Sequence, residues 1–204
     1  MTQTLLQTDC FPLILHLRPV IKLTDDQLFK LCGLNKELRI ERTAEGDLLI
    51  MPPAGAETGK RDADLTIAFG VWAKQDGSGV IFGSSTGFFL PNGAMRSPDV
   101  AWVERSRLAP LTPDQKKKFL PLCPDFVLEL RSPSDRVRTL QAKMREYIEN
   151  GAQLGWLLVP EDRRVYVYRP GRPVERLDDP AEISGDPVLP GFVLHLADIW
   201  EPGL

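Results

Sequence analysis

Two carboxylates stand beside apolar segments in positions where they could share one divalent cation. Asp99 follows Pro98 and opens the apolar segment 100–103, and Glu129 lies near the end of the segment 125–131. Proline cannot donate to a strand ladder, so Pro98 fits a strand start, while the β-branched and aromatic content of 125–131 predicts a mostly buried strand. A carboxylate on such a strand is costly to bury unless it is paired or binds metal. The pattern favours metal-dependent phosphodiester chemistry.

Asp125 is a less suitable partner for Glu129 than Asp99 is. Asp125 and Glu129 share a strand face but lie four residues apart, roughly 13 Å at about 3.3 Å per residue, so they cannot bind one ion. The chain between Asp99 and Glu129 is long enough for their strands to lie side by side, and we predict these two as the pair. The alternative is that Asp99 caps a turn while Glu129 pairs with an arginine.

A helix with a lysine at the edge of its apolar stripe follows Glu129. Ser134 is its predicted N-cap and Asn150-Gly151 its end. The stripe consists of Leu140, Met144, Tyr147 and Ile148. At about 100° per residue, Lys143 lies about 40° from Tyr147, so its ammonium can reach toward the carboxylate strands. The alternative is a surface lysine whose stem covers the stripe.

The order and spacing of several short motifs resemble those of the Uma-type restriction endonuclease family, within the PD-(D/E)XK nuclease superfamily. These motifs are Met51–Gly59, Ser84–Phe88, Arg96–Asp99, Pro124–Ser134, Lys143–Tyr147, Gly151–Trp156 and Leu189–Phe192. The resemblance covers nearly the whole chain. It implies an α/β (α+β) fold in which a restriction-endonuclease-like mixed central β-sheet is flanked by helices.

The resemblance also implies roles for individual residues. Asp99 and Glu129 correspond to the metal-binding carboxylates, and Glu57, near the start of the first long helix, to an additional catalytic acid. Arg131 stands where the superfamily has a lysine, and arginine does not replace a lysine that activates water. Two interpretations remain: Lys143, with Tyr147 one turn further on, has taken over that role, or the site has lost efficient chemistry. The predicted catalytic residues are Glu57, Asp99, Glu129 and Lys143.

The implied mechanism is metal-assisted hydrolysis. Asp99 and Glu129 would hold Mg²⁺, with Mn²⁺ as a substitute, in an oxygen-rich shell that polarises the phosphate and lowers the pKa of a bound water. Lys143 would orient that water or neutralise developing charge, and Arg131 is expected to bind a phosphate oxygen through its planar fork. The predicted substrate-binding residues are Arg96, Arg131, Ser132 and Tyr147.

Composition agrees with one globular domain. The chain has 204 residues, 43% hydrophobic and 26% charged, enough to bury a large core. We expect a single restriction-endonuclease-like domain over 1–204, made of an N-terminal helix and hairpin (20–52), a nuclease core (53–168) and a C-terminal extension (169–204). No stretch approaches about 20 apolar residues and no signal-peptide layout is recognisable, so we expect no membrane partner and a cytoplasmic location.

Other chemistries have less support. Cys10, Cys32 and Cys123 include no pair at zinc-ligand spacing. His16 and His195 each lie between leucines, which favours packed or surface histidines over a catalytic base.

Three functions remain. The first is a Mg²⁺-dependent DNA endonuclease, expected as a homodimer or higher homo-oligomer because double-strand cutting needs two sites. The second is a catalytically decayed nuclease-fold protein that binds nucleic acid, motivated by Arg131. The third is an oligomeric scaffold, motivated by the net charge of −3, which argues against coating nucleic acid through bulk electrostatics.

The elements that must position these residues can be outlined from periodicity and turn signals. We expect a helix at 24–32, a hairpin at 38–51, a long helix at 57–75 with Leu65, Ala68, Phe69 and Trp72 as its buried stripe, and central strands near 80–82, 88–90, 99–103 and 126–130. Strands at 154–159 and 165–168 follow the lysine-bearing helix. The tail from Pro170 is expected to pack the sheet edge or a partner subunit.

Overall fold

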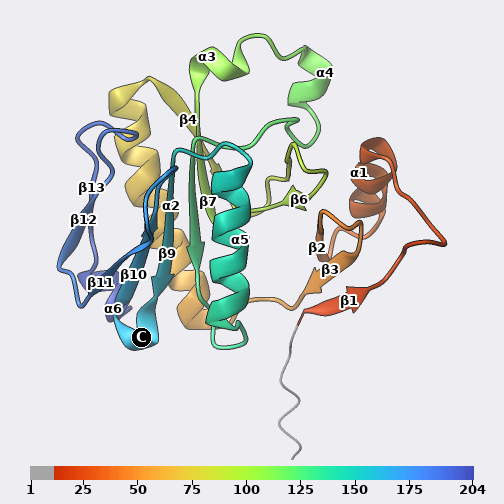
Figure 1. Ribbon diagram of the computed structural model, residues 1–204. Coiled ribbons are helices and arrows are strands. Elements are labelled where there is room, and N and C mark those ends of the chain that lie inside the picture. The colour runs from red at the N-terminus through yellow and green to blue at the C-terminus, as the bar shows by residue number, and fades with distance from the viewer. Residues whose placement is uncertain (1–11) are drawn as a thin grey trace, which may run out of the picture.

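The computed structural model describes residues 12–204, which fold into a larger and a smaller β-sheet with helices packed on them (Figure 1). The larger sheet has the strand order β11-β10-β9-β8-β7-β4. Its strands are β4 (Gly79–Gly83), β7 (Val100–Glu104), β8 (Phe126–Leu130), β9 (Leu154–Val159), β10 (Arg164–Tyr168) and β11 (Glu175–Asp178). β8 is parallel to β9, and the other neighbours pair antiparallel. This mixed sheet flanked by helices confirms the predicted fold class.

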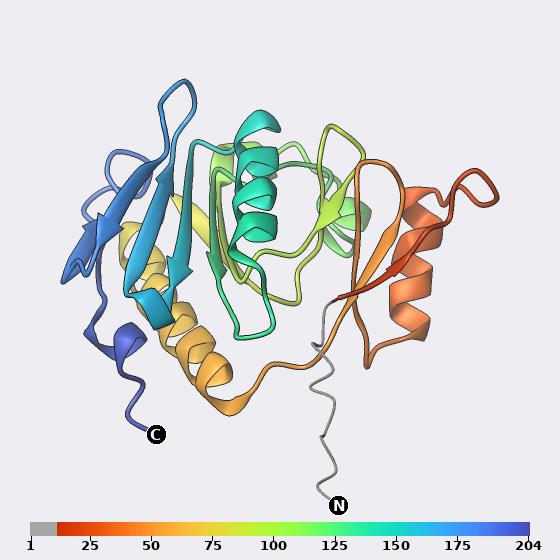
Figure 2. The ribbon, with the colours of Figure 1, turned by 60° about the horizontal axis from the view of Figure 1, so that its bottom comes forward.

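Two long helices cover the two faces of the larger sheet. α2 (Ala56–Asp76) lies on one face and α5 (Val137–Glu149) on the other (Figure 2). Successive residues of β8 point to opposite faces. Phe126 and Leu128 therefore belong to the core cluster under α2, whereas Glu129 faces α5.

The apolar stripes predicted for the two helices are buried as expected. Leu65 and Phe69 of α2 are fully covered, and Ala68 and Trp72 pack against the same cluster. On α5, Leu140, Met144 and Tyr147 are buried, and Ile148 is partly buried beside them. Both helices are thus fixed to the sheet by the faces that the spacing of their apolar residues indicates.

α5 begins later than the sequence indicates. Its predicted N-cap is Ser134, but the helix starts at Val137. Asp135 accepts hydrogen bonds from the backbone nitrogen of Ser132 at 2.9 Å and from its Oγ at 2.7 Å. These bonds hold residues 132–135 in a separate turn, because the Asp135 side chain satisfies donors that a helix start would otherwise leave unpaired.

The smaller sheet belongs mainly to the N-terminal part of the chain. Its strands are β1 (Leu13–Leu15), β2 (Arg39–Arg42), β3 (Leu48–Met51), β5 (Phe88–Phe89) and β6 (Met95–Arg96), in the order β1-β3-β2-β6-β5. α1 (Asp25–Leu34) packs on this sheet through Leu28, which is fully buried with Ile40 and Leu48. The predicted helix at 24–32 is thus present, and its start is capped by Thr24 and Gln27, which bond reciprocally.

One strand prediction is wrong. The sequence pattern predicts a central-sheet strand at 88–90, but β5 lies in the smaller sheet. Gly93, with a φ of 88°, closes a tight turn through which β5 pairs with β6. β6 in turn pairs with β2. The local hairpin therefore diverts this segment from β7 and joins it to the N-terminal strands.

The C-terminal part packs against the edge and one face of the larger sheet, in agreement with the prediction for the tail. β11 forms the sheet edge beside β10. The remaining elements are β12 (Glu182–Ser184), β13 (Val193–His195), α3 (Arg105–Leu108), α4 (Pro113–Lys116), α6 (Ala197–Trp200) and the short 3₁₀ helix η1 (Pro160–Asp162).

Cys32 and Cys123 are free thiols, and Cys10 lies outside the described residues. Within 12–204, no helix has the length and apolar character needed to cross a membrane.

Candidate active site

Pairing of β7 with β8 brings Asp99 and Glu129 to the same end of the sheet. Val100 is opposite Leu128 in this antiparallel pair, so Asp99 lies next to the end of β8. Its Oδ2 accepts a hydrogen bond from the backbone nitrogen of Leu130 at 2.8 Å. Asp99 and Glu129 are both buried. The strands of the two predicted carboxylates are therefore neighbours, as the sequence indicates.

Lys143 reaches this end of the sheet from α5. Its Nζ lies 2.9 Å from Oε1 of Glu129 and 2.9 Å from Oε1 of Glu41. Burial opposes its charge, but the two carboxylates outweigh burial and raise the pKa of Lys143. The lysine is therefore a fixed cation between two carboxylates and not an exposed surface group.

Glu129 is held by two donors from α5. Its Oε1 receives the Lys143 ammonium and a hydrogen bond from the Tyr147 hydroxyl at 2.9 Å. Burial is the main reason that the pKa of Glu129 is raised; Lys143 opposes this shift, and the nearby Asp99 and Glu41 add to it. Tyr147, predicted to bind substrate, is fully buried and orients Glu129.

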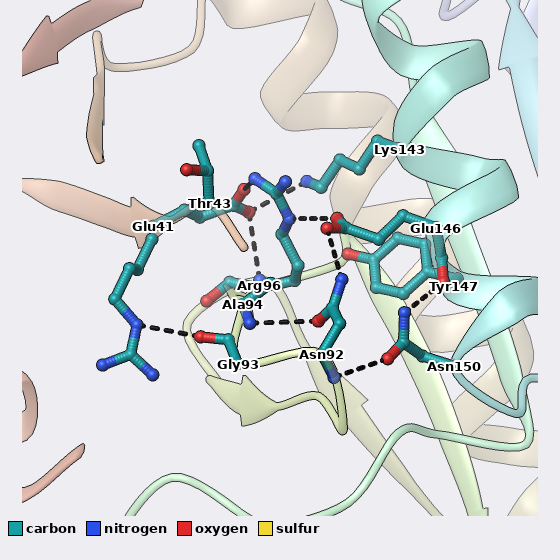
Figure 3. Close-up of polar contacts among 12 residues, drawn as sticks. Glu41, Thr43, Asn92, Gly93, Ala94, Arg96, Lys143, Glu146, Tyr147 and Asn150 are labelled. Atoms are coloured by element: carbon teal, nitrogen blue, oxygen red, sulfur yellow. Dashed lines mark hydrogen bonds and ion pairs between the residues drawn. The ribbon is translucent and has the colours of Figure 1, made fainter. Parts of the chain in front are cut away.

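Glu41, which sequence reasoning missed, comes from β2 of the smaller sheet and is 1% exposed. Its carboxylate accepts hydrogen bonds from Lys143, from the Ser97 backbone nitrogen at 3.0 Å and from Arg96 at 3.2 Å (Figure 3). Burial alone would raise its pKa, but Lys143, Arg96 and Arg39 outweigh burial and lower it to about 2. A buried anion thus joins the smaller sheet to α5.

Arg96, predicted to bind substrate, is a buried part of this network. Besides Glu41, it contacts Oε2 of Glu146 at 2.6 Å through Nε, and Glu146 also accepts from Asn92 (Figure 3). The neighbouring Asn150 accepts from the backbone nitrogen of Asn92. These contacts fasten the turn between β5 and β6 to α5.

Asp62 is the acid of α2 whose charge interacts with that of Asp99. Its pKa is raised to about 7 by burial and by Asp99, with Arg39 opposing, and its Oδ1 is buried without a hydrogen-bond partner among residues 12–204. Glu57, one and a half turns earlier, has a 66% exposed side chain and pairs with Arg61. Both acids line the same groove, Glu57 with the more exposed side chain.

Arg39, also on β2, is the cation beside Asp99. Its Nη2 donates to Oδ1 of Asp99 at 3.1 Å and to the carbonyl oxygen of Ser97 at 2.7 Å. In β2, Arg39 and Glu41 alternate with Ile40 and Arg42, which pack against α1 and its N-terminal end. Because successive residues of a strand point to opposite faces, the alternation in the sequence indicates that Arg39 and Glu41 share the face turned away from α1.

The other two predicted substrate-binding residues lie differently. Arg131 forms an ion pair with Glu161 at 2.7 Å, and its Nε donates to the carbonyl oxygen of Asp135. Ser132 lines the groove with its hydroxyl bonded to Asp135. The structure thus brings together Asp99, Glu129, Lys143, Tyr147 and Arg96, and it does not bring Arg131 to them.

Asp99, Glu129, Lys143 and Arg96 line one groove of about 1250 Å³ between the two sheets. No group of three or more His, Cys, Asp or Glu side chains within 12–204 is arranged to enclose a metal ion. Mg²⁺, however, is usually held by one or two carboxylates together with water and substrate phosphate. The oxygen-only donors of Asp99 and Glu129 and the unpartnered oxygen of Asp62 fit such an ion.

The fold is that of a nuclease-like protein. It matches the crystal structure of a putative nuclease belonging to DUF820 from Anabaena variabilis ATCC 29413, with a TM-score of 0.73 and 19% sequence identity, over 87% of this chain and 97% of that one. Residues 25–197 match the model of the Uma2 family, described as "putative restriction endonuclease", and the chain belongs to that family. No curated protein matches the chain. The family resemblance stated from the motifs is confirmed.

Proposed function

We propose that this protein is a metal-dependent nuclease that hydrolyses phosphodiester bonds of DNA in the groove between its two sheets. One observation carries the proposal: Asp99 of the β7 start, Glu129 of β8 and Lys143 of α5 meet at one end of the larger sheet. Membership of a family described as "putative restriction endonuclease" supports a nucleic-acid substrate.

Asp99 and Glu129 are the proposed ligands of Mg²⁺ or Mn²⁺, with Asp62 as a third acid. A divalent ion there would polarise the scissile phosphate and lower the pKa of a water. A cation would also offset the repulsion between Asp62 and Asp99, which contributes to the raised pKa of Asp62. Glu57 is retained as a candidate with a more exposed side chain in the same groove.

Lys143 is proposed to act as a charge and not as a base. Its ammonium is held protonated by Glu129 and Glu41, so it neutralises negative charge that develops on the phosphate. Tyr147 orients Glu129 through its hydroxyl. Because both donors come from α5, packing of that helix on the sheet fixes the geometry of the proposed site.

A homodimer or higher homo-oligomer, a cytoplasmic location and DNA as the partner remain part of this proposal. Two copies of the site would be needed to cut both strands of a duplex. If the two strands are cut one after the other, supercoiled plasmid is first converted to the nicked form and only then to the linear form.

The test is incubation of the purified protein with supercoiled plasmid and with single-stranded DNA in Mg²⁺, Mn²⁺ or EDTA, beside Asp99→Asn and Glu129→Gln. The expected result is metal-dependent cleavage by the wild type and loss of at least a hundredfold in both variants. Melting temperatures measured in parallel exclude unfolding as the cause. Cleavage that persists in EDTA, or in both variants, would contradict the proposed site.

A second candidate function is nucleic-acid binding without chemistry. It is favoured by Arg131, which replaces the expected lysine and pairs with Glu161 outside the group formed by Asp99 and Glu129. Binding of DNA without cleavage in either metal would support it. Neither binding nor cleavage would favour a scaffold.

A further inference from the structure

The groove is an unusual surface for a polyanionic substrate. Nine acidic and three basic side chains line it. The basic ones are Arg39, Arg96 and Lys143. Because nucleic acid binds proteins mainly through its phosphates, a strand that enters this groove must find a cation that still has hydrogen-bond donors open to it.

Two of the three basic side chains are committed to buried carboxylates. Arg96 pairs with Glu41 and Glu146, and Lys143 pairs with Glu41 (Figure 3). Lys143 also pairs with Glu129. Both cations are nearly covered. Releasing either one would leave a buried carboxylate unpaired, so neither can donate a hydrogen bond to a backbone phosphate, and Lys143 acts on the scissile phosphate through its charge alone.

Arg39 differs from them in exposure and in its donors. Its side chain is 37% exposed, and its hydrogen bonds to Asp99 and Ser97 both come from Nη2. Nη1 takes part in neither of these bonds, whereas Nε is buried and is not open to a ligand. A guanidinium presents five N–H groups in a planar fork that matches two phosphate oxygens. Arg39 therefore keeps donors for an anion while it remains attached to Asp99.

We propose that Arg39 binds a backbone phosphate of a nucleic-acid strand in the groove, next to Asp99. This inference rests on the proposed function, since it takes the groove as the place where nucleic acid lies. It assigns to a β2 residue the phosphate contact that the sequence analysis gave to Arg131, whose guanidinium is occupied by Glu161 and the Asp135 carbonyl. The smaller sheet thus supplies a substrate contact as well as Glu41.

The chain contains a matched control for Arg39. Arg107 pairs with Asp125 at 2.6 Å at the opposite end of the β7 and β8 pair, and its side chain is 36% exposed, nearly the same as that of Arg39. Arg107 is not among the residues that line the groove. Arg39→Gln and Arg107→Gln therefore remove the same charge from the same kind of pair at two different places.

The experiment measures binding of fluorescein-labelled duplex and single-stranded oligonucleotides in EDTA by fluorescence anisotropy, at several salt concentrations. Arg39→Gln is expected to weaken binding about tenfold and to reduce the slope of log K against log salt by about one, whereas Arg107→Gln leaves both unchanged. Arg39→Lys, which keeps the charge but loses the fork, should fall between Arg39→Gln and the wild type. Melting temperatures identify any variant that fails to fold.

The outcomes separate this inference from the proposed function. If Arg39→Gln binds like the wild type with the same salt slope, the inference is wrong, even if plasmid cleavage is intact. The same holds if it changes only Mn²⁺ affinity in calorimetry, because Arg39 would then be merely the counter-ion of Asp99. If the wild type binds but does not cleave, the nuclease proposal fails while the Arg39 contact can still be supported. No binding by the wild type at low salt overturns the inference.

Discussion

Asp99 and Asp125 stand at opposite ends of one pair of strands and are held in the same way. Each follows a proline and precedes an apolar strand, Asp99 before β7 and Asp125 before β8. Asp99 accepts the backbone N–H of Leu130 at the end of β8, and Asp125 accepts that of Glu104 at the end of β7. The antiparallel pairing makes the two ends near-equivalents in backbone terms.

The charges around the two aspartates differ. At Asp125, one arginine meets one carboxylate, because Arg107 donates to Asp125. At Asp99, the single exposed arginine, Arg39, faces Asp99, Glu41 and Glu129 together, and these three raise its pKa against the opposing effect of burial. The charges of one arginine and one carboxylate balance, whereas an excess of buried carboxylates destabilises the fold unless further cations bind nearby. The Asp99 end therefore carries the excess of acid that the proposed metal ion would balance.

The largest expected effect comes from the same substitution at both ends. Asp99→Asn and Asp125→Asn each weaken an arginine pair and keep an acceptor for the backbone N–H, so each should lower the free energy of unfolding by about 1–2 kcal/mol. Cleavage should fall about a thousandfold only in Asp99→Asn, since a proposed metal ligand is lost. Initial nicking rates and urea unfolding measure the two quantities. Equal losses of cleavage would mean that stability, not chemistry, is affected.

The next effect concerns the cation that balances the Asp99 end. Lys143→Met leaves Glu41 and Glu129 buried without their shared ammonium, which is expected to cost about 3–5 kcal/mol in urea unfolding. Arg107→Met at the other end should cost only about 1 kcal/mol because that pair is more exposed. Adding Glu41→Gln to Lys143→Met should recover part of the loss.

The cleavage rate sharpens the same comparison. Lys143→Met is expected to lose about a hundredfold in rate at temperatures where it is folded, since the charge that faces the phosphate is gone. An unchanged rate would refute the proposal that Lys143 replaces the missing lysine at Arg131. A loss of stability no larger than that of Arg107→Met would instead indicate a surface lysine.

The strand pair and the lysine could be predicted because their signals are local. Proline before Asp99, the apolar run around Glu129 and the helical phase of Lys143 relative to Tyr147 are all read within a few residues. The alternation of faces along a strand and the position of Lys143 at the edge of the helical stripe then determine the directions in which these side chains point. These signals were sufficient to place three side chains from three elements near each other.

Glu41 and Arg39 could not be found in this way. Glu41 is 102 residues from Lys143 in sequence, and its role depends on how the smaller sheet docks beside α5. The sequence also could not decide which acid of α2 faces Asp99. Glu57 and Asp62 lie five residues apart, about 140° around the helix, and only the docking of α2 determines which side of the helix faces Asp99. Long-range docking, not local propensity, decides both.

A smaller effect is expected from the acid that α2 contributes. The pKa of Asp62 is raised from 3.8 to about 7, so the native state keeps a proton that the unfolded state releases near pH 4. Its stabilising effect is complete below pH 4 and is lost as the pH rises to 7. Asp62→Asn in EDTA should therefore match the wild type near pH 4 and exceed it at pH 8 by about 1–2 kcal/mol, allowing for partial exposure.

Thermal unfolding from pH 4 to pH 8 measures this difference, with Asp125→Asn as the control at the other end. Asp125→Asn loses an ion pair and should be less stable than the wild type at pH 8. Addition of Mg²⁺ at pH 8 should stabilise the wild type more than Asp62→Asn, since a cation removes the same penalty. If Asp62→Asn is less stable than the wild type at pH 8, the charged Asp62 carboxylate does not destabilise the native state, and the prediction is wrong.

The smallest expected effect compares two buried tyrosine hydroxyls. Tyr147 donates to Glu129, whereas the Tyr168 hydroxyl is buried with no partner in the described part of the chain. Tyr147→Phe should cost about 1 kcal/mol and slow cleavage less than tenfold, because Lys143 still holds Glu129. Tyr168→Phe should be neutral or slightly stabilising, because it removes an unsatisfied polar group. If both substitutions lower the free energy of unfolding by the same amount, the hydrogen bond from Tyr147 adds no stability. Lys143 alone would then orient Glu129.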